Sequence, residues 1–198
     1  MTKFINPCQD KPYLIFREQY ETAKIANQKN IEAILISSFN SKKKEVDSRF
    51  VNLKFVNNEE FIFFSNYESP KAEDFRTHSQ ISACIFWASI NIQIRFKAII
   101  KKTSAEFNKN YFRTRHPGKN ALAISSNQSQ IIDSYESVEK KYNDIKDYAD
   151  LESCPKSWGG FSFTPYEFEF WHGHEKRLNK RMKFIKSESK WENYILEP

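Results

Sequence analysis

The stretch GGFSFTPYEFEFW, residues 159–171, alternates aromatic residues with small or charged ones, as a β-strand with one buried face does. The alternation changes phase partway along. Phe163 occupies an odd position before Thr164-Pro165, and Phe168 an even position after it. Because side chains in a regular strand repeat every two residues, the change predicts a bulge or a strand edge at Thr164-Pro165.

Other stretches share this strand-like pattern, and the polar runs NSKKKE and NNE between them suit hairpin turns. The expected strands are EAILISSF (32–39), VDSRFVNLKFV (46–56), EFIFFSNY (60–67), ISACIFWA (81–88), NIQIRFKAII (91–100), KRMKFIK (180–186) and WENYIL (191–196).

Three regions are predicted to be helical. The spacing of apolar residues predicts an amphipathic helix over about residues 11–29. A short helix is expected over 69–79, with Ser69 as its N-cap and Pro70 at its first position. The segment 104–151 is expected to be mostly helical, with a break at Pro117-Gly118. This order of elements indicates an α+β protein with a closed or nearly closed antiparallel barrel flanked by helices.

The composition is that of a folded intracellular protein. The 198 residues include 39% hydrophobic and 16% aromatic side chains, and no linker rich in Gly, Ser or Pro divides them, so we expect a single domain over 1–198. The three cysteines lie far apart without a CxxC pair, which favours a reduced, cytoplasmic setting. No signal peptide or membrane span is predicted.

The stretch FWHGHEKRLNKR, residues 170–181, admits several functional interpretations. His172 and His174 would share one face of a strand, but the third and fourth ligands of a zinc site are absent, so no metal is expected. The net charge of +6 is small, and no nucleic-acid-binding motif accompanies it. Catalytic-triad, Rossmann and P-loop motifs are also absent.

Two pairs of residues have the spacing of a phosphate site. Tyr111 and Arg115 lie four residues apart, as do Arg177 and Arg181, so the members of each pair would share a helical face. Arginine offers forked donors that match phosphate oxygens. For either pair alone, a solvated helix face is the better explanation of the spacing.

Motifs in a fixed order give a more specific indication. The chain resembles the pyridoxine/pyridoxamine 5'-phosphate oxidases, which are homodimeric FMN enzymes with a split-barrel fold. The matching blocks are SRFVNLK (48–54), FFSNYESPKA (63–72), FWASINIQIRFKA (86–98), YFRTRHPG (111–118), SSNQSQ (125–130), WGGFSFTPYEFEFWHG (158–173), RLNKR (177–181) and a closing W-x-x-x-x-L-x-P.

The resemblance implies a role for each matching position. It implies a phosphorylated substrate held by Lys54, Tyr111 and Arg115, with Arg177 over the pyridine ring, and oxygen as the final electron acceptor. It implies FMN bound at the dimer interface by residues from both subunits. These are Arg49, Lys54, Phe64, Ser65, Lys71, Gln93, Gln128, Ser129, Trp171 and Arg181. Since Arg49 and Lys54 are five apart, a regular strand would point them to opposite faces, so a bulge or contacts with different parts of the ligands are needed.

Three positions depart from the family pattern. Asn179 stands where the closing motif usually has a histidine. The resemblance implies that Arg177 and Asn179 are the catalytic residues, and Asn179 can still hydrogen-bond to the substrate, but it cannot become a cation. Lys119 replaces a serine that usually binds the substrate phosphate, and it still suits phosphate as a point charge. Pro70 replaces an arginine near the FMN phosphate. The sequence therefore leaves three functions open: a vitamin B6 phosphate oxidase, a split-barrel flavin oxidase acting on another reduced ring as phenazine-pathway relatives do, and a non-catalytic FMN-binding protein.

Overall fold

The computed structural model describes residues 1–198 and contains one sheet of ten strands. The strands follow the path β1-β4-β5-β8-β7-β6-β2-β3, and β9 and β10 branch from β8. Every pairing is antiparallel except that of β1 with β4. The strand bounds are β1 (Lys3–Pro7), β2 (Ala33–Asn40), β3 (Glu45–Asn52), β4 (Phe55–Asn58), β5 (Glu60–Asn66), β6 (Gln80–Trp87), β7 (Ile92–Lys102), β8 (Trp158–His172), β9 (Lys180–Ser187) and β10 (Lys190–Leu196).

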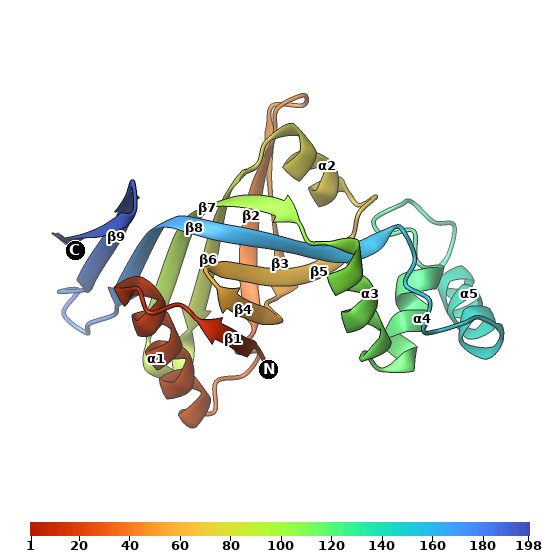
Figure 1. The fold of residues 1–198 in the computed structure, drawn as a ribbon, viewed down its shortest axis with the longest axis horizontal. Coiled ribbons are helices and arrows are strands. Elements are labelled where there is room, and N and C mark those ends of the chain that lie inside the picture. The colour runs from red at the N-terminus through yellow and green to blue at the C-terminus, as the bar shows by residue number, and fades with distance from the viewer.

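Five α-helices and one short 3-10 helix flank the sheet. Figure 1 shows α3, α4 and α5 gathered at one end of the molecule, while β9 and the C-terminus lie at the other. None of the helices is long and apolar enough to cross a membrane. The helix bounds are α1 (Lys11–Ile25), α2 (Pro70–Thr77), η1 (Ala88–Ile90), α3 (Ala105–Arg113), α4 (Pro117–Ser125) and α5 (Tyr135–Tyr148).

A seam between β3 and β4 gives the barrel its split form. These strands follow each other in the chain but lie near opposite ends of the sheet path, with only Leu53 and Lys54 between them. The amide of Leu53 donates to the carbonyl of Glu32 at 2.8 Å, while that of Lys54 donates to Ile62 on β5, also at 2.8 Å. The sheet therefore curls back on itself without closing. The predicted α+β split barrel is confirmed, but the single strand expected over 46–56 is wrong.

The irregularity predicted in the long strand β8 is also present. Lys97 of β7 faces Glu167, and its neighbour Ala98 faces Pro165, so Tyr166 is the extra residue of a bulge. The first part of β8 pairs with β5 and the part after the bulge pairs with β9. This bend lets one strand serve both the barrel and the C-terminal hairpin.

The barrel interior is filled mainly by phenylalanine rings. Phe61 and Phe163 stack with their centroids 5.2 Å apart, and Phe16 of α1 meets Phe61 edge to face at 5.0 Å. All three side chains are buried. Burial of one such ring contributes about 1.5–3 kcal/mol of hydrophobic free energy, so this aromatic set is the main source of the core's stability.

Helix ends differ from the prediction in two places. The first helix ends at Ile25, not near residue 29, because Asn27 adopts a left-handed conformation with φ 54°. The amides of Asn27 and Gln28 turn back to the carbonyls of Lys24 and Ala23, which completes a Schellman motif. In the second place, the helix break lies at 114–116, and Pro117 begins α4 because its fixed φ suits a first helical position.

Candidate active site

A cavity of about 900 Å³ opens along the seam, between β3, β5 and the helices α2, α3 and α4. Its lining is mostly polar and includes residues from every one of these elements. Ten of the residues predicted to bind cofactor or substrate line it together: Arg49, Lys54, Phe64, Ser65, Lys71, Tyr111, Arg115, Lys119, Gln128 and Ser129.

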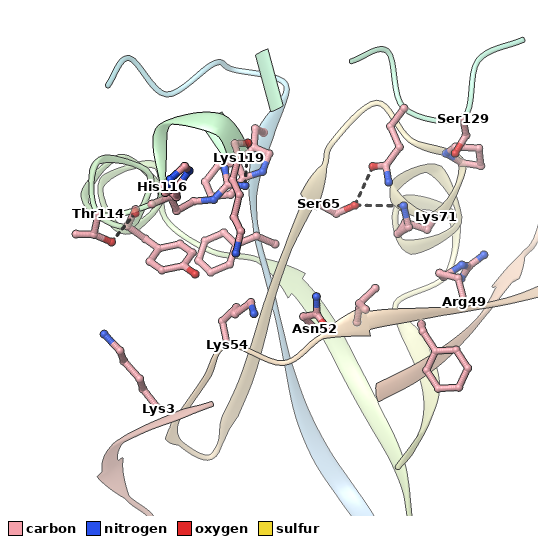
Figure 2. Close-up of a pocket in the computed structure, with 18 of the residues that line it drawn as sticks. Lys3, Arg49, Asn52, Lys54, Ser65, Lys71, Thr114, His116, Lys119 and Ser129 are labelled. Carbon is pink, nitrogen blue, oxygen red and sulfur yellow. Dashed lines mark hydrogen bonds between the residues drawn. The ribbon is translucent and has the colours of Figure 1, made fainter. Parts of the chain in front are cut away.

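The break in the sheet explains how Arg49 and Lys54 reach the same cavity. Arg49 belongs to β3, and the chain leaves regular strand geometry at Leu53 before Lys54. The alternation of side chains along a regular strand therefore does not extend from Arg49 to Lys54, and both side chains can face the cavity. Figure 2 shows Lys54 on the connection near the middle of the cavity and Arg49 on the strand at one side.

At the α2 end, Arg49 is held in a polar network. Its Nη1 donates to the hydroxyl of Ser38 at 2.6 Å, and its Nη2 donates to Asp47 at 2.6 Å. The carboxylate of Asp74 lies 3.5 Å from the same Nη2. Asp74 is buried and also accepts from Ser38 and from Asn40, so its position is fixed independently of any ligand. The guanidinium is thus oriented before a ligand arrives.

Lys71 lies beside this network, near the start of α2. Its ammonium donates to the hydroxyls of Ser65 and Ser69, each at 3.2 Å, and its side chain has no carboxylate partner in an ion pair. Burial, assisted by the nearby charge of Arg49, lowers the pKa of Lys71 to about 8. A buried lysine that makes only neutral hydrogen bonds favours the arrival of an anion such as phosphate.

The loop after α4 closes this end of the cavity. The side-chain oxygen of Gln128 accepts from the hydroxyl of Ser65 at 3.2 Å and from the amide of Asn66 at 3.3 Å. Ser129 follows with φ 68°, a left-handed conformation that costs free energy for a residue with a side chain. Figure 2 shows Ser65, Lys71 and Ser129 close together on this side.

The α3 end has aromatic walls and further cations. The rings of Tyr111 and Phe64 lie 4.2 Å apart, and Phe64 stacks on Trp158 at 4.9 Å. The guanidinium of Arg115 lies 4.4 Å above the ring of Trp158. Its Nη2 donates to the carbonyl of Lys119 at 3.2 Å, whereas its Nη1 is buried without a hydrogen-bond partner. A buried cationic donor left unpaired is unfavourable unless a ligand satisfies it.

Eight lining residues were missed at the sequence level, among them Lys3, His116, Trp158 and Asp47. Lys3 comes from β1, which was not predicted, and its amide donates to the carbonyl of Lys54 at 2.9 Å. His116 caps α4 by accepting from the amide of Gly118. Trp158 and Asp47 line the cavity as well. His116, Trp158 and Asp47 carried a usable signal, because they lie in or beside the motif blocks quoted above.

The other five predicted site residues lie outside this cavity. Gln93, Trp171 and Arg181 form one cross-strand row over β7, β8 and β9. Arg177 and Asn179 belong to the loop between β8 and β9, where Arg177 has φ 62° and Asn179 accepts from the amide of His174 at 3.0 Å. One chain therefore contains two separate groups of predicted site residues, one in the cavity and one on the β7–β9 row and its loop.

The cavity has the chemistry to bind a planar phosphorylated ligand. Arg49 and Lys71 supply cationic donors at one end, and Arg115 and Lys119 supply them at the other. Phe64 and the rings beside it form an aromatic wall between the two ends. The buried unpaired donor of Arg115 and the buried ammonium of Lys71 fit FMN and a second phosphorylated molecule.

Comparisons with known proteins agree with this description. Residues 158–198 match the family model described as the pyridoxine 5'-phosphate oxidase C-terminal dimerisation region. The pyridoxine/pyridoxamine 5'-phosphate oxidase of Christiangramia forsetii is 33% identical over 193 residues, which cover 96% of this chain and 89% of that protein.

Two solved structures share the fold. PhzG from Burkholderia lata 383, solved in complex with tetrahydrophenazine-1-carboxylic acid, superposes with a TM-score of 0.89 at 19% identity, over 98% of this chain and 95% of that one. A pyridoxamine 5'-phosphate oxidase-related, FMN binding protein from Nostoc punctiforme gives a TM-score of 0.78 at 10% identity, over 92% and 97%.

Proposed function

Because this chain belongs to the pyridoxine/pyridoxamine 5'-phosphate oxidase family, we propose that it is an FMN-dependent oxidase. Its substrates would be pyridoxine 5'-phosphate and pyridoxamine 5'-phosphate, and its product pyridoxal 5'-phosphate. The observation that carries the proposal is the convergence of ten predicted ligand-binding residues on one cavity, from five separate elements and the connections beside them. Such convergence is not expected of residues that merely share a solvated surface.

The two ends of the cavity suit the two phosphorylated molecules. The FMN phosphate would bind at the α2 end, where Arg49 and Lys71 are already oriented and where Ser65 and Gln128 offer polar contacts. The substrate phosphate would bind at the α3 end, where the free Nη1 of Arg115 would donate to it. The hydroxyl of Tyr111 and the ammonium of Lys119 would add further donors there.

When bound, FMN supplies the redox chemistry, which is acceptance of a hydride from C4' of the substrate and return of two electrons to oxygen to give hydrogen peroxide. The residues of this chain supply binding and alignment. Arg177 would lie over the pyridine ring and orient C4'. Asn179 could hold the substrate by a hydrogen bond, but its amide does not titrate, so no proton would be stored at this position.

The separation of the two groups of site residues supports a homodimer. We infer that the β7–β9 row and its loop complete the cavity of a partner subunit, so that each FMN contacts both chains. The match of residues 158–198 to a dimerisation region is consistent with this arrangement, since that region includes Trp171, Arg177 and Arg181. A two-fold dimer would form two equivalent sites.

A second candidate is a flavin oxidase acting on another reduced ring. The structural similarity to PhzG and the substitutions Lys119 and Asn179 favour it. A lysine can bind a carboxylate as readily as a phosphate, so the α3 end could accept a ring carboxylate. A non-catalytic FMN-binding protein would share the cofactor contacts but would not reduce the flavin with either class of substrate.

Anaerobic titration of the FMN-loaded protein separates these candidates. Pyridoxine 5'-phosphate or pyridoxamine 5'-phosphate should bleach the flavin absorbance and yield pyridoxal 5'-phosphate. The Arg177→Ala variant should retain FMN but bleach far more slowly. Flavin that stays yellow with both B6 phosphates but bleaches with a reduced ring carboxylate would support the second candidate instead. A protein that takes up no FMN would refute both.

A further inference from the structure

Glu169 is a buried carboxylate on the outer face of the sheet. Its neighbours in β8, Phe168 and Phe170, point into the core, so Glu169 points the other way. Only 8% of its side chain is exposed, a low value for a carboxylate outside the core. The groups that cover it include two arginines, whose opposite charges offset the cost of burying a carboxylate.

The two arginines use different oxygens of this carboxylate. Arg181 of β9 donates from Nε at 3.0 Å and from Nη2 at 2.8 Å, both to Oε1 of Glu169. Arg95 of β7 donates from Nη1 to Oε2 at 3.2 Å. Glu169 thus bridges β7 and β9 through their side chains, across the strand on which it lies.

The hydrogen bonds of Arg181 leave a defined part of its guanidinium free. Besides Glu169, it donates from Nη1 to the carbonyl of Glu197 at 2.9 Å. A guanidinium has five N–H groups, and three of them are used by these contacts. One hydrogen on each terminal nitrogen remains without a partner in the chain. A fixed guanidinium with two free donors is well suited to hold an anionic or carbonyl group of a ligand.

The backbone and side chain of Arg181 lie in different rows of the sheet. Its backbone pairs with Trp171, in the row that also contains Gln93, whereas its guanidinium reaches along the sheet to Glu169. Without the carboxylate, Arg181 would be surrounded by the positive charges of Arg95 and Lys183, which belong to the row of Glu169. Repulsion would then favour other rotamers of a long side chain.

We propose that Glu169 is a positioning residue for FMN binding, acting through Arg181. It holds the guanidinium in one orientation beside the β7–β9 row, so that the two free N–H groups are already placed to meet the cofactor. This inference rests on the proposed function, because it takes Arg181 to be a cofactor ligand. Its consequence is an FMN affinity that depends on a carboxylate that does not itself contact the flavin.

Glu167 provides a matched control two residues away. It lies on the same face of β8, is 14% exposed, and also pairs with two cations, Lys97 at 3.4 Å and Lys183 at 3.1 Å. The decisive difference is that neither of these partners is a predicted cofactor ligand. Glu167→Gln and Glu169→Gln therefore remove similar charges from similar surroundings.

The test measures the FMN affinity of each apoprotein by quenching of flavin fluorescence. Thermal unfolding of the same apoproteins measures their stability. Glu169→Gln should weaken FMN binding about tenfold, because the hydrogen bonds that it weakens involve charged groups. Glu167→Gln should change FMN affinity by less than about twofold, as expected for a partly exposed ion pair. In an Arg181→Ala background, Glu169→Gln should have no further effect on affinity.

The double variant distinguishes positioning from a general structural role. Equal losses of FMN affinity in Glu167→Gln and Glu169→Gln would overturn the inference. It would also be overturned if adding Glu169→Gln to Arg181→Ala lowered FMN affinity by as much as Glu169→Gln does alone. Those results would leave the proposed function intact, since wild-type protein would still bind FMN. Wild-type protein that binds no FMN would refute the proposed function itself, and this inference with it.

Discussion

Lys71 is a cavity residue whose ligand binding should depend on pH. Its pKa is lowered to about 8 by burial and then by the charge of Arg49. A phosphate bound beside it would favour the ammonium form and raise that pKa again. Above pH 8 the free protein must therefore take up a proton when FMN binds. Below pH 8 Lys71 is already protonated, so FMN binding takes up no proton there.

The resulting prediction is a fall in FMN affinity as pH rises through 8, approaching about tenfold per pH unit. Fluorescence titrations between about pH 7 and pH 9.5 would measure it. Lys71→Arg is the matched control, since a guanidinium stays charged throughout this range and should give a flat profile. A wild-type profile as flat as that of the variant would show that Lys71 does not contact the phosphate.

At the level of single residues, motif order led to ten side chains that line one cavity but not to the groups that hold them. Arg49 and Lys71 lie in the cavity as expected. Asp74, which fixes Arg49 together with Ser38, was not predicted, because a carboxylate on a short helix gives no sign of which strand it will face. Such partners are set by tertiary packing, which no local spacing encodes.

At the level of elements, α3 is attached to β8 by buried Asn108. Its side-chain oxygen accepts from the amide of Gly160 at 2.9 Å and from the hydroxyl of Thr103 at 2.6 Å, and its amide nitrogen donates to the hydroxyl of Tyr67 at 2.9 Å. A Cβ added at Gly159 would lie 2.2 Å from that hydroxyl and 2.5 Å from the amide nitrogen of Asn108. Only glycine lets the helix approach the strand so closely.

Gly159→Ala should therefore destabilise the protein by about 1–3 kcal/mol, because α3 must move away from β8. Since α3 carries Tyr111, the KM for the phosphorylated substrate should rise more than the dissociation constant of FMN. Thermal unfolding and steady-state kinetics would measure the two effects.

The control is Gly118→Ala in α4, where the nearest atom to a new Cβ is the hydroxyl of a tyrosine side chain, at 2.9 Å. Alanine is the better helix former, so this change should cost little stability. Equal destabilisation in both variants would contradict the role of the close approach.

Most strands with alternating patterns were predicted correctly, whereas β1 was missed and the single strand expected over 46–56 is two strands, β3 and β4. β1 has only five residues, nearly all of them exposed, so alternation could not reveal it. The interruption at Leu53-Lys54 was hidden for another reason. Leu53 is buried like a strand residue, although its amide and that of Lys54 bond to segments on either side of the seam. A pattern of hydrophobicity records burial but not the partner of each amide.

At the level of the whole molecule, the sequence predicted the members of the site but could not show that one chain leaves them in two groups. Gln93 and Trp171 are neighbours across β7 and β8, whereas Phe64 and Tyr111 line the cavity near α3. Both pairs of positions came from the same set of motifs, and motif order carries no information about distance. The separation becomes meaningful only if two chains contribute to each site.

Subunit complementation would test that condition directly. Arg115→Ala alters the cavity, and Arg177→Ala alters the β8–β9 loop, so each homodimer should have almost no activity. In a mixed dimer, one site would combine both changes, and the other would combine an unaltered cavity with an unaltered loop. Equal amounts of the two variants, unfolded and refolded together, should form half mixed dimers with one working site each. Oxidase activity should then recover to about a quarter of the wild-type value.

If each cavity were completed by its own loop, every site would carry one of the two changes and mixing would restore no activity. Recovery to this level would therefore locate Arg177 in the partner's site.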